Sequence, residues 1–153
     1  MKVQKAMAKK PLYLKNNDTL SYAVKVFSKN DISGCPVIFK KRVVGIITRT
    51  DIINAIDPHS RIIKDIDLIA LVDATLKDSR FENMKRSIKK TMAMPIDRFM
   101  NKKVVCIEEN DDVYNAARLM NKRDISILPV VRDRKLVGVL TRTDIIRILH
   151  RLG

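Results

Sequence analysis

The residues best suited to chemistry form a six-letter phrase, Thr-Arg-Thr-Asp-Ile-Ile, which occurs at 48–53 and again at 141–146. An ionised aspartate offers two acceptor oxygens, which suit two neighbouring hydroxyls such as those of a ribose. If a helix begins at the phrase, its unpaired N–H groups and positive dipole end also favour a phosphate. The candidates for contact with the sugar are Asp51, Asp144, Thr48 and Thr141.

The same phrase has a purely structural interpretation. A T-x-x-D pattern before an apolar helix is close to a capping box, although such a box prefers Glu or Gln at its fourth place. Thr48 would then cap the helix, and Asp51 would favour its dipole. The two interpretations are compatible, because a ribose-binding aspartate can lie in the first turn of a helix.

The phrase belongs to a longer repeat. Met7 corresponds to Met100, an offset of 93 residues (100 − 7), and the register needs no gap from Met7 to Ile53. We therefore predict two repeated units, 1–57 and 94–153, separated by an insert at 58–93.

Each unit has the pattern of a β-α-β-β-α element order. An extended stretch leads to a helix whose N-cap is predicted in the turn 16–18, or 109–111 in the second unit. Two apolar strands follow, joined by a charged turn at 40–42 or 133–135, and the phrase then opens the last helix. The predicted fold class is α/β (α+β), with two units packed through their sheets in pseudo-two-fold symmetry, plus a helical insert. The apolar stripes of that insert are Ile62, Ile63, Ile66 and Ile69, and Phe81, Met84, Ile88 and Met92.

The motif residues of both units resemble those of the CBS domain. Ser33-Gly34-Cys35-Pro36-Val37 precedes the strand pair and 45–52 follows it, and the pattern recurs as Ser126-Ile127-Leu128-Pro129-Val130 with 138–145. The resemblance implies a tandem CBS pair, or Bateman module, of the stand-alone prokaryotic kind, with an archaeal source favoured. Such a pair is a regulatory or sensor module that binds adenosine-containing ligands in clefts between its units and often forms a homodimer. The insert is longer than the usual linker of the family.

With an adenosine ligand in view, the candidate residues extend beyond the phrase. Adenine would be bound largely by backbone groups at Leu12, Ile32, Ser33, Cys35 and Pro36, and at Val105, Ile125, Ser126, Leu128 and Pro129. The phosphate candidates are Arg49, Arg142, Lys29, Lys122 and Arg123. We expect the site of the first unit, beside Gly34 and Cys35, to be roomier than that of the second, beside Ile127 and Leu128.

The net charge of +14 and the pI near 10.0 favour anionic partners. AMP, ADP or ATP therefore suits the chain better than S-adenosylmethionine, whose sulfonium is cationic, while methylthioadenosine needs no phosphate partner. Two other interpretations stay open: a nucleic-acid-binding protein on a CBS scaffold, and a structural partner subunit with degenerate pockets. The basic helix face that would meet nucleic acid or an acidic protein comprises Lys85, Arg86, Lys89 and Lys90.

The remaining features argue against several classes of protein. Cys35 and Cys106 lack zinc-type spacing and are interpreted as small apolar residues in a reducing cytoplasm. No catalytic arrangement or phosphate-binding glycine loop stands apart from the repeat, so we predict neither an enzyme nor a metal site nor a required cofactor. No apolar run approaches the roughly 20 residues of a membrane span, and we predict a cytoplasmic protein without membrane contact.

Overall fold

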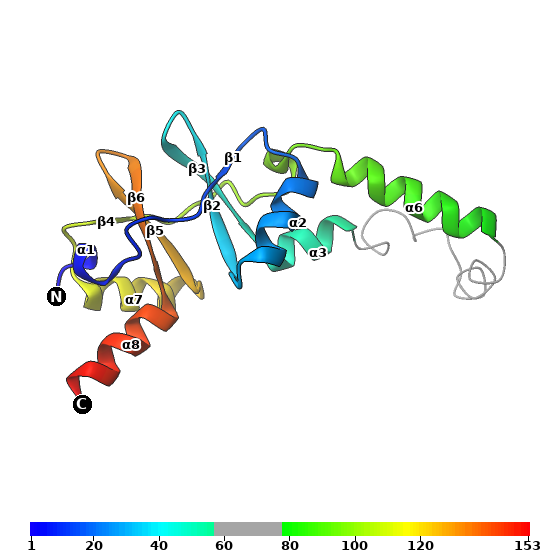
Figure 1. Ribbon diagram of the computed structural model, residues 1–153. Coiled ribbons are helices and arrows are strands. Elements are labelled where there is room, and N and C mark those ends of the chain that lie inside the picture. Colours follow the sequence, from blue (N-terminus) through cyan, green and yellow to red (C-terminus); the bar gives the residue numbers. More distant parts are fainter. Residues whose placement is uncertain (57–77) are drawn as a thin grey trace.

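The computed structural model describes residues 1–56 and 78–153 (Figure 1). The first repeat contains α1 (Val3–Ala6), β1 (Leu14–Lys15), α2 (Leu20–Lys29), β2 (Gly34–Phe39), β3 (Arg42–Thr48) and α3 (Arg49–Ile56). The rest contains α6 (Asp78–Met92), the 3-10 helix η1 (Ile96–Arg98), β4 (Ile107–Glu108), α7 (Val113–Arg123), β5 (Ile127–Arg132), β6 (Lys135–Thr141) and α8 (Arg142–Leu152). The predicted β-α-β-β-α order is confirmed in both units, whereas the stripe predicted at Ile62, Ile63, Ile66 and Ile69 lies outside the described residues.

The strands form one six-stranded sheet in the order β1-β2-β3-β6-β5-β4. Within each unit the short first strand is parallel to the second, and the second and third form an antiparallel hairpin. The two units meet at β3 and β6, where Arg42 pairs with Lys135 and the Leu136 N–H donates to the Lys41 carbonyl at 3.1 Å. The fold class is therefore as predicted, with the sheets of the two units joined edge to edge.

Two hydrophobic cores lie between the sheet and its helices, one for each unit. Each core takes a residue from the other half of the chain. Val3 of α1 is fully buried in the core of the second unit, and Ile96 of η1 is fully buried in the core of the first. The repeated units therefore exchange their first short helices.

The segments that follow these helices also cross to the other unit; we call 7–13 and 100–106 the leading segments. Ala8 and Val139 exchange two backbone hydrogen bonds of 2.9 and 3.2 Å, and Ile46 and Asn101 exchange two of 3.0 and 2.8 Å. As the chain crosses, the side chain of Met7 covers Gly138, and that of Met100 covers Gly45. A glycine is needed at position 138, because a Cβ there would lie only 2.9 Å from the Ala8 carbonyl oxygen, whereas the three nearest atoms at Gly45 all belong to the flexible Met100 side chain.

Two local predictions are wrong by one residue. The N-caps of α2 and α7 are Thr19 and Asp112, just after the predicted turns; the Thr19 hydroxyl accepts from the Tyr22 N–H at 3.1 Å. Asp18 lies within the predicted turn, but its carboxylate instead accepts from the Lys15 N–H at 2.7 Å and so closes that turn. Since both residue types are good caps, the local pattern could not choose between adjacent positions.

The hairpin turns are also shorter than predicted. Each contains two residues in the left-handed region, Lys40 and Lys41 with φ of 50° and 67°, and Asp133 and Arg134 with φ of 51° and 66°. Two consecutive left-handed residues are typical of a type I′ turn, whose twist matches that of the flanking strands. The third residue of each predicted turn is therefore free to begin a strand, and these residues form the junction between the units.

Candidate functional site

Both copies of the phrase lie where a strand becomes a helix. β3 ends at Thr48 and α3 begins at the next residue, and β6 ends at Thr141 immediately before α8. In the second copy the Thr141 hydroxyl accepts from the Asp144 N–H at 3.2 Å, and the Asp144 carboxylate accepts from the Thr141 N–H at 2.9 Å. The first copy has the same bonds, at 3.3 and 2.8 Å, between Thr48 and Asp51. The capping interpretation is thus confirmed, with aspartate in the place that usually holds Glu or Gln.

Capping leaves one carboxylate oxygen of each aspartate available. The threonine hydroxyl donates to the same Oδ2 that accepts the backbone N–H, at 2.9 Å in Asp51 and 2.7 Å in Asp144. Among the described residues, the Oδ1 of Asp144 has only the exposed guanidinium of Arg147, at 3.4 Å. The Oδ1 of Asp51 has no partner among residues 1–56 and 78–153. Each aspartate can therefore cap its helix and still accept a hydrogen bond from a ligand.

Each aspartate borders a cleft that both units build. Thr141 and Asp144 line a cleft of about 560 Å³ together with Leu12, Ile32 and Ser33 of the first unit. We call it the Asp144 cleft. Its lining joins the ribose candidates of one copy to the adenine candidates of the other.

The other cleft is built in the same way but is smaller. Thr48 and Asp51 line about 230 Å³ together with Val105, Ile125 and Ser126 of the second unit. We call it the Asp51 cleft. The lining of both clefts thus crosses between the units, as the exchange of leading segments requires.

The larger cleft is the one beside Gly34, as we expected, but the aspartate that lines it is Asp144 and not Asp51. Gly34 lines the Asp144 cleft, while its counterpart Ile127 lines both clefts. The two residues face each other, since a Cβ at Gly34 would lie 3.3 Å from the Ile127 Cγ2. The missing side chain at Gly34 therefore enlarges the cleft of the second aspartate, because the linings cross between the units.

The arginines of the phrase hold the loops beside the clefts. The Arg49 Nε donates to the Ile32 carbonyl at 2.8 Å, and its other nitrogen pairs with the fully exposed Asp31 at 2.7 Å. The Arg142 Nε donates to the Ile125 carbonyl at 3.0 Å. An exposed ion pair such as that of Arg49 contributes only about 0–1 kcal/mol, so a phosphate can compete for the guanidinium. Both arginines line the Asp144 cleft.

The structure separates the other candidates into two groups. Pro36 lines the Asp144 cleft, where Ala8, Lys10 and Arg147 are lining residues that sequence reasoning missed. Met7 and Met100 correspond in the repeat, as do Gly45 and Gly138, and these pairs were a signal for the missed leading-segment residues. Their meaning depends on the crossing, because each methionine packs on the glycine of the other unit. The candidates that line neither cleft are the buried Cys35, Leu128 and Pro129 and the exposed Lys29, Lys122 and Arg123.

The surroundings of both cysteines disfavour the thiolate form. Burial, and to a lesser extent the nearby Asp18, raises the pKa of the Cys35 thiol to about 12. Burial and Glu108 also raise the pKa of Cys106. Within the described ranges, no group of three His, Cys, Asp or Glu could hold a metal ion, and no helix is long and apolar enough to cross a bilayer.

Comparison with known proteins identifies the repeated unit. The family model of the CBS domain matches residues 3–58 and 96–151. An uncharacterised protein of Methanocaldococcus jannaschii is 33% identical over 153 aligned positions, covering 95% of this chain and 89% of that protein. The chloroplastic CBS domain-containing protein CBSX2 of Arabidopsis thaliana is 27% identical over 88% of this chain, which spans 56% of its length. CBS-domain pairs are regulatory modules rather than catalytic ones.

Solved structures share the fold across almost the whole chain. The CBS domain pair of protein MJ0100, in complex with 5′-methylthioadenosine and S-adenosyl-L-methionine, has a TM-score of 0.69 at 24% identity and covers 100% of this chain and 98% of its own. The complex of CBSX2 with AMP has a TM-score of 0.72 at 20% identity and covers 99% and 97%. Both of these CBS-pair structures thus contain adenosine-containing ligands.

Proposed function

Because the chain belongs to the CBS-domain family, we propose that it is a regulatory module whose principal site, the Asp144 cleft, binds an adenosine-containing ligand. The observation that carries the proposal is the state of Asp144. One oxygen of its carboxylate is fixed by the cap and the other pairs with the exposed Arg147, and the residue lines a cleft with room for a nucleotide. Ligand pockets commonly have volumes of about 300–1,000 Å³. The Asp51 cleft lies below that range, which favours the Asp144 cleft.

The lining of the Asp144 cleft suggests how each part of a nucleotide is held. Oδ1 of Asp144 accepts hydrogen bonds from the ribose hydroxyls. Ile32 and Ser33, in the loop before β2 that Arg49 holds, lie across the cleft, and we expect their backbone to contact adenine. The sheet side of the cleft is closed by Pro36 and Val139, whose apolar surfaces exclude water from the ring.

The charges around the cleft favour a phosphorylated ligand. Four cationic side chains line it, those of Lys10, Arg49, Arg142 and Arg147, against two carboxylates, those of Asp31 and Asp144. This excess attracts the phosphates of AMP, ADP or ATP and repels the sulfonium of S-adenosylmethionine. Uncharged methylthioadenosine remains a ligand that ribose and base contacts alone could hold.

A ligand in this cleft contacts both units and thereby acts as a regulator. It shifts the arrangement of the units only by the difference in its affinity for the two arrangements. The surface that could transmit such a shift is apolar and lies on the last helices. Ile146, Leu149 and Leu152 of α8 are 64%, 61% and 75% exposed, and Ile53 of α3 is 60% exposed. We propose that a second copy of the chain covers this face, because large exposed apolar side chains on one helix mark an interface.

Calorimetric titration with AMP, ADP, ATP, S-adenosylmethionine and methylthioadenosine tests the proposal. Asp144→Asn keeps an acceptor for the helix cap but removes the charge that binds the ribose. A hydrogen bond to a charged group contributes about 1.5–3 kcal/mol, so we expect the affinity for AMP to fall at least tenfold. The matched variant Asp51→Asn changes the smaller cleft and leaves this affinity within about twofold. If none of the five ligands binds, or if Asp144→Asn binds AMP as the unaltered chain does, the proposal is contradicted.

The basic face of α6 supports a second candidate function, nucleic-acid binding. Lys85, Arg86, Lys89 and Lys90 are all exposed, with Lys85 also 3.7 Å from Glu82, and α6 extends away from the two units (Figure 1). Binding to phosphates through such a face weakens steeply with salt. A mobility-shift assay with duplex DNA and RNA tests this function, and the absence of a complex at low salt rejects it.

A further inference from the structure

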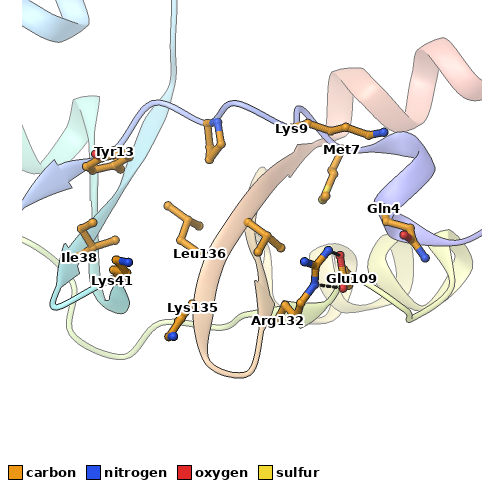
Figure 2. A pocket seen from close by; sticks show the side chains of 12 residues that line it. Gln4, Met7, Lys9, Tyr13, Ile38, Lys41, Glu109, Arg132, Lys135 and Leu136 are labelled. Carbon is orange, nitrogen blue, oxygen red and sulfur yellow. Dashed lines mark hydrogen bonds and ion pairs between the residues drawn. The ribbon is translucent and has the colours of Figure 1, made fainter.

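A second large groove lies between the leading segment 7–13 and the tips of the two hairpins (Figure 2). We call it the hairpin groove. Its volume is about 620 Å³, and it shares only Pro11 with the Asp144 cleft and no residue with the Asp51 cleft. Met7, Lys9 and Tyr13 face this groove, whereas Ala8, Lys10 and Leu12 line the cleft. Alternation along one extended segment thus separates two sites.

The hairpin groove has an apolar floor and a cationic rim. Leu136 of β6 lies near its centre, with Ile38 of β2 on one side (Figure 2), and Val137 of β6 is also part of the lining. Lys41 and Lys135 come from the two hairpins at the junction of the units, where the Lys41 carbonyl accepts from the Leu136 N–H. Lys9 on the leading segment is the third lysine of the lining. In the described part of the chain, none of these three lysines forms an ion pair with a carboxylate.

The acidic residue of the groove, Glu109, is already paired with Arg132. Glu109 is 6% exposed, and its two carboxylate oxygens accept from the Arg132 guanidinium, one of them at 2.6 Å. This fork, aided by the positive charge of Arg132, holds the pKa of Glu109 below its usual range. The pair therefore neutralises itself and leaves the charge of the lysines uncompensated. No carboxylate oxygen of the lining remains for a ribose, in contrast to the Asp144 cleft.

We propose that the hairpin groove is a second ligand site, which binds the oligophosphate chain of a nucleoside triphosphate or of inorganic triphosphate through Lys41, Lys135 and Lys9. Like charges that face one volume without counter-charges repel one another, and an anion placed among them removes that repulsion. The groove has the size of a small-molecule site. Tyr13, 49% exposed at its edge, offers a ring on which any base can stack. Recognition through phosphate and stacking makes the site tolerant of the base, so ATP and GTP bind alike.

Calorimetry with inorganic triphosphate, ATP, GTP and adenosine at physiological salt tests the assignment. We expect the double variant Lys41→Gln/Lys135→Gln to lower the affinity for inorganic triphosphate at least tenfold. Lys9→Gln, on a separate segment, should lower this affinity severalfold. The control Lys89→Gln/Lys90→Gln removes the same charge from α6 and changes the affinity less than twofold. Thermal unfolding verifies that each variant is folded.

The choice of ligands distinguishes inorganic triphosphate from a nucleoside triphosphate, and the hairpin groove from the clefts. If inorganic triphosphate and ATP both respond to the double lysine variant, the groove binds the phosphate chain itself; if only ATP and GTP do, it requires the nucleoside as well. Adenosine carries no phosphate and reports the clefts alone, so its failure to bind counts against the proposed function and not against the groove. Three results overturn the proposal: an equal loss of affinity in the α6 control, a loss of affinity for inorganic triphosphate in Asp144→Asn, or no binding of any phosphate ligand.

Discussion

Replacing Gly138 with alanine perturbs the crossing of the leading segment over β6. A Cβ at Gly138 would lie 2.9 Å from the Ala8 carbonyl oxygen and 2.9 Å from the Met7 Cγ. The same change at Gly45 brings the Cβ 2.9 Å and 3.0 Å from the Cγ and Cε of Met100, and its three nearest atoms all belong to that side chain. The two glycines occupy equivalent places in the repeat, but of the three nearest atoms at each, a backbone atom is present only at Gly138. Gly45→Ala is therefore the matched control.

The expected change in the free energy of unfolding differs between the two variants. Neither glycine has a positive φ, so alanine fits the backbone conformation of both strands and gains roughly 0.5–1 kcal/mol over glycine. Overpacking costs about 1–3 kcal/mol. At Gly45 the flexible Met100 can move away, so the low end applies and the net change is near zero. At Gly138 the Ala8 carbonyl must move, and with it the two backbone hydrogen bonds that Ala8 exchanges with Val139, so the high end applies and the net loss is about 2 kcal/mol.

Urea unfolding of both variants, followed by circular dichroism and compared at equal slope with the unaltered chain, measures this difference. Displacement of Ala8 also moves the wall of the Asp144 cleft, so we expect Gly138→Ala to weaken AMP binding and Gly45→Ala to leave it unchanged. Equal stability losses, or a larger loss for Gly45→Ala, refute the argument that the backbone contact at Gly138 decides the cost.

Three further outcomes follow from local features. Arg134→Gly removes a left-handed non-glycine residue from a hairpin turn and should raise the free energy of unfolding by about 0.5–1 kcal/mol in urea titrations; a loss would mean that the Arg134 side chain stabilises the turn. Because the folded-state pKa of Glu109 is lowered, its stabilising effect is present above its ordinary pKa of 4.5 and disappears as the pH falls through the folded value. The stability of Glu109→Gln, measured between pH 6 and 3, should therefore fall less on acidification than that of the unaltered chain, and parallel curves would contradict the role of the Arg132 pair. Since Cys35 is fully buried and Cys106 only half-buried, mass spectrometry after thiol alkylation of the native protein should find label on Cys106 first; equal rates would indicate that the first core opens readily.

The repeat made most of the fold predictable. In both copies the helices carry apolar residues at the helical period and the two central strands are continuous apolar runs, so each copy checks the other. The phrase at 48–53 and 141–146 also predicted the helix cap correctly, because a cap depends on residues only three apart. Its predicted contact with a ribose stays a prediction. The same local logic failed by one residue at Thr19, where two adjacent residues can each cap.

The clefts could not be assigned from the pattern alone. A leading segment finds a glycine in the same place on either unit, Gly45 or Gly138, so sequence gives little preference between packing on its own unit and packing on the other. The crossing places Asp144, and not Asp51, in the larger cleft beside Gly34. The hairpin groove depends equally on distant segments, which bring Lys9, Lys41 and Lys135 to one place.

By itself, the sequence determined two β-α-β-β-α units, their buried faces, and a threonine and an aspartate at the start of each last helix. These properties depend on periodicity and on contacts within a few residues, which repeat faithfully in both copies. The tertiary structure alone decided which unit each leading segment covers, which cleft is large, and which charges meet. Those outcomes depend on small packing differences between two nearly equivalent partners, such as glycine against isoleucine at 34 and 127, and they arise only when the units are assembled.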